Sequence, residues 1–120
     1  MAVQSMINTQ AYDRLKKQAT LYHASDPDDA RHLSRLINRE NRFKDFSLST
    51  SGFFYDFSKQ RVDTDALNEL RALARETQAM DTFRRMMAGE KINTTENRAV
   101  LHTACRDFSS ESLCLDGIDV

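Results

Sequence analysis

Few side chains in this sequence stand at spacings that could support catalysis or metal binding. The three histidines are His23, His32 and His102, and no two of them have the i, i+4 spacing with which a helix presents a pair of metal ligands. We interpret each as a surface or packing residue. Ser109 and Ser110 have no accompanying base in the sequence pattern, so nucleophilic catalysis is not indicated.

Acidic residues crowd one short segment around the single proline. They are Asp26, Asp28 and Asp29. A calcium-binding loop needs ligands at more positions than these three supply. Acidic side chains near a helix N-terminus are stabilised by the helix dipole, and proline is favoured at the first helical position. The cluster therefore predicts the start of a helix rather than a cation site.

Lys91, beside Gly89, raises the possibility of a phosphate site, because helix N-termini and lysine both attract anions. The segment lacks the glycine-rich loop and the Lys-Ser/Thr ending of a P-loop. We interpret Gly89 as a helix C-cap and Lys91 as a surface or docking residue. Glu96 and Arg98 are expected to act as a helix cap and an ion-pair partner. No catalytic, cofactor-binding or metal-binding residue is assigned.

The overall charge argues against two classes of partner. Seventeen basic and eighteen acidic residues give a formal net charge of −1. A nucleic-acid or anionic-membrane surface would favour a basic chain. There is also no apolar run long enough to cross a bilayer. We expect neither a nucleic-acid nor a membrane partner.

The N-terminus and the cysteines indicate a cytoplasmic location. Residues 1–8 lack the basic segment and apolar stretch of a secretion signal, and we expect them to be a disordered leader. Cys105 and Cys114 have neither the number nor the spacing of a disulfide framework or a zinc site. Free thiols in the cytoplasm are the interpretation that fits.

Five helices are predicted, with a β-hairpin between the second and the third. Apolar residues at helical spacing predict the first helix over roughly residues 9–24, and Ser25 to Pro27 predict the start of the second. Apolar and polar residues alternate with a period of two over residues 46–49, which predicts a strand. Ser51-Gly52 then form a plausible turn into a second strand over residues 53–57. The aromatic side chains of that second strand are expected to pack in a hydrophobic cluster.

The remaining helices follow the hairpin. Asp63 or Thr64 is expected to cap the third, and the fourth follows Gln78 with methionines that we expect to fill a core. The fifth is predicted from Thr95 to about Arg106, capped by Asn93 or Thr94. Beyond it, residues 113–115 resemble a short strand and Asp116-Gly117 a turn. The fold class is mainly α with a short β-hairpin.

Three segments carry a recognisable pattern. Their sequences are Tyr55-Asp56-Phe57-Ser58-Lys59-Gln60-Arg61-Val62, then Ala88-Gly89-Glu90-Lys91-Ile92-Asn93 continued by Thr95-Glu96 and Arg98-Ala99-Val100-Leu101-His102, and finally Leu115-Asp116-Gly117-Ile118-Asp119-Val120. In this order they resemble the phosphoglucose isomerase (glucose-6-phosphate isomerase) family. The resemblance extends over roughly residues 43 to 120. We call the middle segment, residues 88–102, the signature segment.

The resemblance implies an aldose-ketose isomerase that interconverts glucose 6-phosphate and fructose 6-phosphate. The family opens the sugar ring and moves a proton between C2 and C1 through a cis-enediol, with a glutamate as base and no cofactor. Its phosphate-binding cluster, base, ring-opening histidine and late lysine lie further along a much longer chain, and no segment here matches them.

The chain is therefore expected to be the N-terminal scaffold of such an enzyme. Residues 9–120 would form the helical N-terminal segment of a larger α/β fold, truncated at Val120 before the first sugar-isomerase domain. Its partners would be the remainder of the isomerase chain, which binds the sugar phosphate, and a second copy in a homodimer. Alone, it should be inactive. A free-standing helical interaction module is the alternative.

Overall fold

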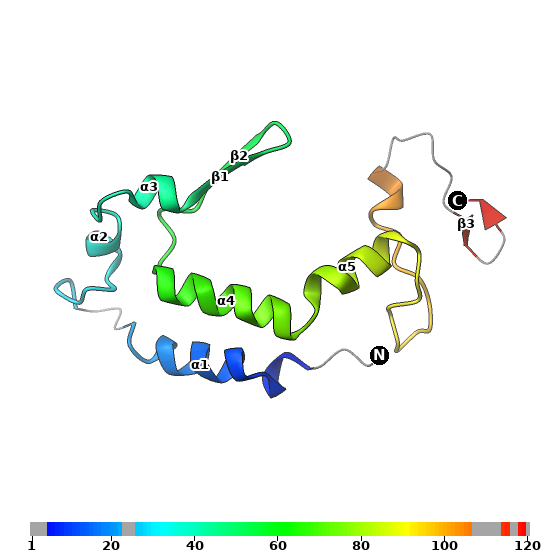
Figure 1. The fold of residues 1–120 in the computed structure, drawn as a ribbon, viewed down its shortest axis with the longest axis horizontal. Coiled ribbons are helices and arrows are strands. Elements are labelled where there is room, and N and C mark those ends of the chain that lie inside the picture. Colours follow the sequence, from blue (N-terminus) through cyan, green and yellow to red (C-terminus); the bar gives the residue numbers. More distant parts are fainter. Residues whose placement is uncertain (1–4, 23–25, 107–113, 116–117, 120) are drawn as a thin grey trace. The chain divides into compact units, whose positions relative to one another are not determined.

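The computed structural model describes residues 5–22, 26–106, 114–115 and 118–119. The chain divides into two compact units, and α4 runs from one into the other. Met6–Leu73 form the first unit, and Ala74–Val120 belong to the second. Figure 1 shows a mainly helical chain with a two-stranded hairpin, which confirms the predicted fold class.

The first helix, α1, spans Gln10–Ala19 and follows a turn of 3-10 helix, η1, at Met6–Asn8. Thr9 caps α1, because its hydroxyl oxygen accepts a hydrogen bond from the Tyr12 amide at 3.2 Å. The helix is shorter than predicted: it ends at Ala19. Of the leader expected over residues 1–8, residues 1–4 lie outside the described residues, and residues 6–8 form η1.

The predicted helix start at Ser25 to Pro27 is wrong for the described residues, and Ser25 lies outside them. Residues 26–32 form turns instead, because Asp26 Oδ1 accepts from the Asp28 amide at 2.9 Å and Asp29 Oδ1 accepts from the Arg31 amide at 2.6 Å. Such side-chain bonds to nearby amides compete with helix formation.

Two short helices follow these turns. The first, α2, spans Leu33–Leu36, and the second, α3, spans Arg42–Asp45. Asn41 separates them in a left-handed conformation with φ of 59°. Asparagine adopts that conformation more readily than most residues, and it breaks the run of helical backbone. The second predicted helix is therefore reduced to the four residues of α2, and α3 was not predicted.

The predicted hairpin is confirmed. Its strands, β1 at Ser47–Thr50 and β2 at Phe53–Asp56, pair antiparallel from Ser47 opposite Asp56 to Thr50 opposite Phe53. Ser51 and Gly52 both have positive φ, 47° and 79°. This combination is typical of the two-residue turns that match the twist of paired strands.

The packing expected of the hairpin aromatics is only partly present. Phe57 lies 5.6 Å from the Phe46 ring and 5.6 Å from the Tyr55 ring, centroid to centroid. Phe53, however, is 76% exposed, and Phe54 and Tyr55 are also largely exposed. Aromatic contacts thus continue onto β2, where Tyr55 stacks on Phe57 and Phe54 lies 5.7 Å from Phe43, but only Phe46, at the base of the hairpin, is buried.

The third and fourth predicted helices are present as α4, Thr64–Glu76, and α5, Ala79–Met87. The Ala66 amide donates to Asp63 Oδ1 at 2.8 Å, so Asp63 is the cap of α4. On α5, Met80 and Met87 are 59% and 51% exposed, and no residue of the helix is buried. The prediction that these methionines fill a core is therefore wrong at both positions.

The fifth predicted helix, Thr95 to Arg106, is wrong. The backbone of Asn93 pairs with that of Arg98 through two hydrogen bonds of 3.3 Å, which close a loop, and Asn97 has a φ of 51°. Only a 3-10 turn, η2 at Ala104–Arg106, follows. The five α-helices of the described residues therefore match the predicted number but are not the predicted set.

Two short strands end the described chain. They are β3 at Cys114–Leu115 and β4 at Ile118–Asp119, paired antiparallel. The strand predicted at residues 113–115 is confirmed at 114–115, and the turn predicted at residues 116–117 lies outside the described residues.

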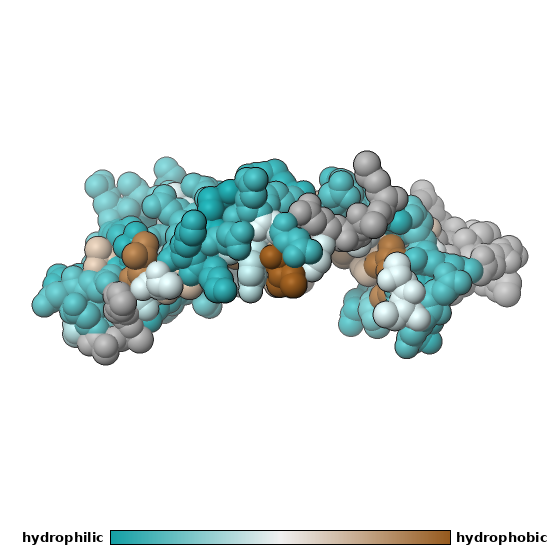
Figure 2. All heavy atoms as spheres, turned by 90° about the horizontal axis from the view of Figure 1, so that it is seen from below, coloured by the Kyte–Doolittle hydropathy of each residue, from teal (hydrophilic) through white to brown (hydrophobic). Residues whose placement is uncertain are grey.

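The core is small and half polar. Among the described residues, every buried apolar side chain lies in the first unit: Ala11, Leu36, Phe46 and Ala66. Four polar residues are equally well buried: Thr9, Arg42, Ser58 and Asp63. On the face shown in Figure 2, small separate hydrophobic patches interrupt a mostly hydrophilic surface. None of the described helices has the length and apolar character required to span a membrane.

Candidate functional site

Arg42 holds the chain between the hairpin and α4. Its guanidinium donates to three backbone carbonyls: Ser58 at 2.8 Å, Gln60 at 2.7 Å and Val62 at 2.8 Å. The same group lies 3.6 Å from the centroid of the Phe46 ring. Only 5% of Arg42 is exposed. Its planar fork of donors suits an irregular loop whose carbonyls would otherwise be buried without partners.

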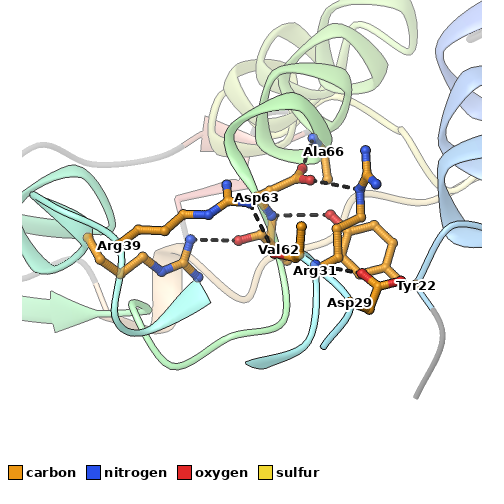
Figure 3. A network of polar contacts seen from close by, with 9 residues as sticks. Tyr22, Asp29, Arg31, Arg39, Val62, Asp63 and Ala66 are labelled. Atoms are coloured by element: carbon orange, nitrogen blue, oxygen red, sulfur yellow. Dashed lines mark hydrogen bonds and ion pairs between the residues drawn. The ribbon is translucent and has the colours of Figure 1, made fainter. Parts of the chain in front are cut away.

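Asp63 stands where that loop becomes α4, and three groups converge on it. Its Oδ1 caps the helix, and its Oδ2 accepts from Arg31 Nε at 3.2 Å. The Asp63 amide donates to the Tyr22 hydroxyl oxygen at 3.2 Å. Figure 3 shows Tyr22, Arg31 and Asp63 pointing toward one another at the start of α4. We call these residues and Arg42 the arginine–aspartate network.

The electrostatics of the network follow from burial and hydrogen bonding. Burial alone raises the pKa of Asp63, but the Ala66 amide, the Tyr22 hydroxyl and Arg31 outweigh it, so the pKa lies below its ordinary value. Burial raises the pKa of Tyr22. Burial, and then the nearby charge of Arg39, lower the pKa of Arg42, which nevertheless stays protonated in a protein.

These properties suit structural support and not proton transfer. A general base must have a free lone pair within reach of a substrate and a pKa near the working pH. The Asp63 carboxylate has its oxygens engaged and its pKa held low. The network is therefore a clamp that sets the start of α4 relative to the end of α1.

Two cavities adjoin the network within the first unit. One has a volume of about 230 Å³ and is lined by Ala30, Arg31, Arg39, Asp63, Thr64 and Asp65. The other, of about 290 Å³, lies between α1 and α4 and is lined by Leu15, Gln18, Ala19, Tyr22, Arg61, Val62, Ala66 and Leu70. In the first cavity both arginines already donate to protein oxygens, Arg39 to the Ala30 carbonyl at 3.0 Å.

The residues around the proline have structural roles. Asp26 and Asp29 accept bonds from amides in the turns described above, and Asp28 forms an ion pair with Arg35. His32 is the N-cap of α2, and its Nδ1 lies 2.8 Å from the Ser34 hydroxyl oxygen. His23 lies outside the described residues. Within the described part of the chain, no three His, Cys, Asp or Glu residues gather as a metal site would require.

The signature segment begins at the end of α5. Gly89 has a φ of 77°, its amide donates to the Met86 carbonyl at 3.0 Å, and the Glu90 amide donates to the Arg85 carbonyl at 3.0 Å. These two bonds define a Schellman C-cap, which confirms the predicted role of Gly89. The Glu90 carboxylate also accepts from Arg85 Nε at 2.6 Å.

The loop that follows is held by its own side chains. Asn93 Oδ1 accepts from the Thr95 hydroxyl at 2.7 Å and from the Glu96 amide at 3.3 Å. Glu96 in turn accepts from Arg98 Nε at 2.7 Å, which confirms the predicted ion pair. The prediction that Asn93 and Glu96 cap a helix is wrong, because no α-helix follows among the described residues and the Asn93 side chain closes a loop instead.

The phosphate interpretation of Lys91 loses its geometric basis. Lys91 follows the C-terminus of α5, the negative end of the helix dipole, and the helix expected after it is absent. His102 is exposed, and its carbonyl accepts from Arg106 Nη1 at 3.3 Å. Among the described residues, His32, His102, Lys91 and the aspartates around the proline are not brought together in one site.

Sequence reasoning missed Arg42. No local pattern marks it, because its three acceptors lie 16 to 20 residues further along the chain. The useful signal was the polar loop of residues 58–62 between a strand and a helix. Its buried carbonyls need a donor, and a buried arginine is the side chain that can serve several at once.

Comparison with known proteins identifies the family. Residues 56–120 match the phosphoglucose isomerase family. The glucose-6-phosphate isomerase of Desulfosudis oleivorans is 46% identical over 89 residues, which cover 74% of this chain and 16% of the relative. That of Pseudoalteromonas translucida is 41% identical over 111 residues, 92% of this chain and 19% of the relative.

A third relative gives the same result. The glucose-6-phosphate isomerase of Pseudomonas aeruginosa is 40% identical over 103 residues, 86% of this chain and 19% of the relative. The chain thus spans less than one fifth of the length of these curated relatives. The match contains the loop that Arg42 clamps, the Asp63 cap and the whole signature segment. This chain belongs to the phosphoglucose isomerase family.

Proposed function

We propose that this chain is the N-terminal scaffold of a glucose-6-phosphate isomerase, which interconverts glucose 6-phosphate and fructose 6-phosphate. The observation that carries the proposal is the family match over residues 56–120, together with relatives that are more than five times longer than the aligned segment. The polar side chains of the arginine–aspartate network and of the signature segment are engaged in capping and clamping, which supports a scaffold role.

The chain by itself is proposed to be inactive. Isomerisation needs a base held within hydrogen-bond reach of the proton that it moves. Asp63, the best buried carboxylate of the described residues, is committed to Ala66, Arg31 and Tyr22. The remainder of the isomerase polypeptide would supply the sugar-phosphate site. A homodimeric assembly and a cytoplasmic location of the full protein are parts of the same proposal, and they rest on the family resemblance.

The test compares three purified proteins in an assay of fructose 6-phosphate isomerisation. They are this 120-residue chain, the full product of its gene, and a chimera in which this chain replaces the aligned segment of the Pseudoalteromonas translucida isomerase. We expect activity in the gene product and in the chimera, and none in the 120-residue chain. Turnover by the 120-residue chain after removal of host isomerase would refute the proposed inactivity.

A matched pair of chimeras tests the scaffold role. Arg42→Met removes a buried arginine with three backbone acceptors, whereas Arg35→Met removes an exposed arginine that pairs with exposed Asp28. We expect Arg42→Met to lower the yield of folded, active chimera and Arg35→Met to leave it unchanged. Equal effects of the two changes would count against a scaffold built on Arg42.

One observation favours a second candidate, a free-standing interaction module. Phe53, Phe54, Met80, Phe83 and Met87 are each at least 45% exposed, and exposed apolar side chains in such number are typical of protein-binding surfaces. The remainder of an isomerase would cover such residues equally well. The chimera separates the two candidates, because an interaction module has no reason to restore catalysis in a foreign isomerase.

A further inference from the structure

The cavity of about 290 Å³ between α1 and α4 combines apolar walls with polar groups that lack partners. Five of its lining residues are apolar: Leu15, Ala19, Val62, Ala66 and Leu70. The other three, Gln18, Tyr22 and Arg61, carry polar tips. Ligand and docking pockets have this composition, in which apolar walls supply binding area and a few polar groups supply orientation.

The unpaired groups belong to two of those residues. Among the described residues, Gln18 Oε1 is buried without a hydrogen-bond partner, and so are Nε and Nη2 of Arg61. Leaving a buried donor or acceptor unpaired is unfavourable, and more so for a charged group. Native proteins rarely leave such groups unpaired, so an absent acceptor for Arg61 is the simplest explanation.

Arg61 differs from the other arginines near the cavity. Arg31 forms an ion pair with Asp63, and Arg42 donates to three carbonyls. For Arg61 the described residues provide only a cation–π contact, with its guanidinium 5.8 Å from the centroid of the Tyr22 ring. That contact is weak enough for the long side chain to turn toward a better partner. The cavity therefore has an excess positive charge at one edge.

We propose that this cavity receives an acidic, apolar-flanked segment from the remainder of the isomerase polypeptide, with a carboxylate on Arg61. The inference rests on the proposed function. Two observations select this occupant: the unpaired guanidinium calls for a negatively charged acceptor, and the curated relatives are more than five times longer than the segment aligned here. A bidentate carboxylate would satisfy both buried nitrogens, and apolar side chains beside it would fill the cavity.

The first experiment identifies the occupant directly. A photo-crosslinking amino acid replaces Leu70, which lines the cavity, in the full-length gene product, and the adduct is mapped by mass spectrometry. A matched protein carries the crosslinker at Arg71, which is exposed on α4 and does not line the cavity. We expect the Leu70 position to crosslink to a segment beyond residue 120 that contains an Asp or Glu next to apolar residues, and the Arg71 position not to.

The second experiment uses the direction of a stability change. If a carboxylate pairs with Arg61, Arg61→Leu lowers the midpoint of thermal unfolding of the full-length protein by about 2 °C, while Arg71→Leu changes it by less. If the cavity has no acidic occupant, Arg61→Leu removes an unpaired buried charge and leaves the midpoint unchanged or raises it. Ala19→Trp, which places a large ring at the cavity, should abolish the Leu70 crosslink.

The outcomes separate this inference from the proposed function. An active full-length isomerase whose Leu70 position crosslinks only within residues 1–120, to a second copy or to another protein overturns the occupant while the function stands. So does an unchanged or raised midpoint for Arg61→Leu. A full-length product without isomerase activity overturns the proposed function, whatever the crosslink shows. The expected adduct together with a lowered midpoint supports the docking of an acidic segment.

Discussion

The first unit and the signature segment are held together in different ways. In Met6–Leu73, the bonds of Arg42 and those that join Asp63 to Arg31 and Tyr22 connect residues 16 to 41 positions apart, and the Arg42 and Asp63 side chains are at most 8% exposed. In the signature segment, the bonds join residues two to five positions apart, and the Glu96 and Arg98 side chains are 54% and 72% exposed. The easily recognised segment is thus the locally built one.

The contacts that leave a recognisable pattern in the sequence are not the contacts expected to stabilise the fold most. Local caps and turns depend on residue type at fixed offsets, so they leave a readable pattern. Buried long-range bonds depend on which segments meet, and removing one leaves a polar group without water or a partner. We therefore expect substitutions in the arginine–aspartate network to lower the free energy of unfolding the most, and substitutions in the signature segment to lower it the least.

The largest effect is expected for Arg42→Met. The change leaves the carbonyls of Ser58, Gln60 and Val62 without their donor. A loss of about 3 kcal/mol in the free energy of unfolding is expected, because one buried and two partly buried carbonyls lose their donor together. Urea denaturation of the chain measures it. Arg42→Lys should recover only part of the loss, because an ammonium cannot present the same planar fork.

Asp63→Asn is expected to have the second-largest effect on stability, and the size of that effect should depend on pH. The amide keeps a cap for α4 but loses the charge that faces Arg31, which should cost about 2 kcal/mol. Because the folded pKa of Asp63 is lowered, its contribution is present above the unfolded pKa, about 3.9, and is lost as pH falls below it.

Denaturation curves between about pH 2 and 7 test this directly. The stability gap between the wild type and Asp63→Asn should narrow below about pH 4. A gap that stays constant through this range would show that the charge of Asp63 does not stabilise the fold.

Gly89→Ala tests the C-cap of α5. Gly89 has a φ of 77°, a conformation in which alanine is strained. We therefore expect the free energy of unfolding to fall by about 1 kcal/mol. Gly89→Asn should cost less, because asparagine tolerates this conformation. Gly52→Ala is the matched control in the hairpin: its φ is 79° and no atom lies within 4 Å of an added Cβ, so only backbone strain contributes.

The smallest effect is expected for Glu96→Gln. It breaks the exposed pair between Glu96 and Arg98, and such pairs contribute about 0.5 kcal/mol or less. Thermal unfolding in low and high salt measures this contribution. The unfolding midpoint of the wild type should approach that of the variant as the salt concentration rises, because salt screens the ion pair. If Glu96→Gln lowered the free energy of unfolding as much as Asp63→Asn does, the signature segment could not be stabilised by local contacts alone.

Sequence reasoning succeeded wherever the decisive contact is local. Gly89 as a C-cap, Asp63 as an N-cap and Ser51-Gly52 as the hairpin turn were each predictable from residues within a few positions. It failed at residues 26–32 and 95–103, where capping residues were interpreted as helix starts. There, side chains bond to nearby amides and close turns, and no buried apolar face is available to favour a helix.

The sequence was enough to predict the family, the mainly helical class, the hairpin and the caps at Asp63 and Gly89, because these follow from residue types at short, fixed spacing. The fold was needed to find that Arg42 clamps residues 58–62, that Tyr22 and Arg31 meet at Asp63, and that Nε and Nη2 of Arg61 have no acceptor among the described residues. The physical reason is distance along the chain. A buried polar group accepts whichever partner the fold brings to it, and no spacing rule records that choice.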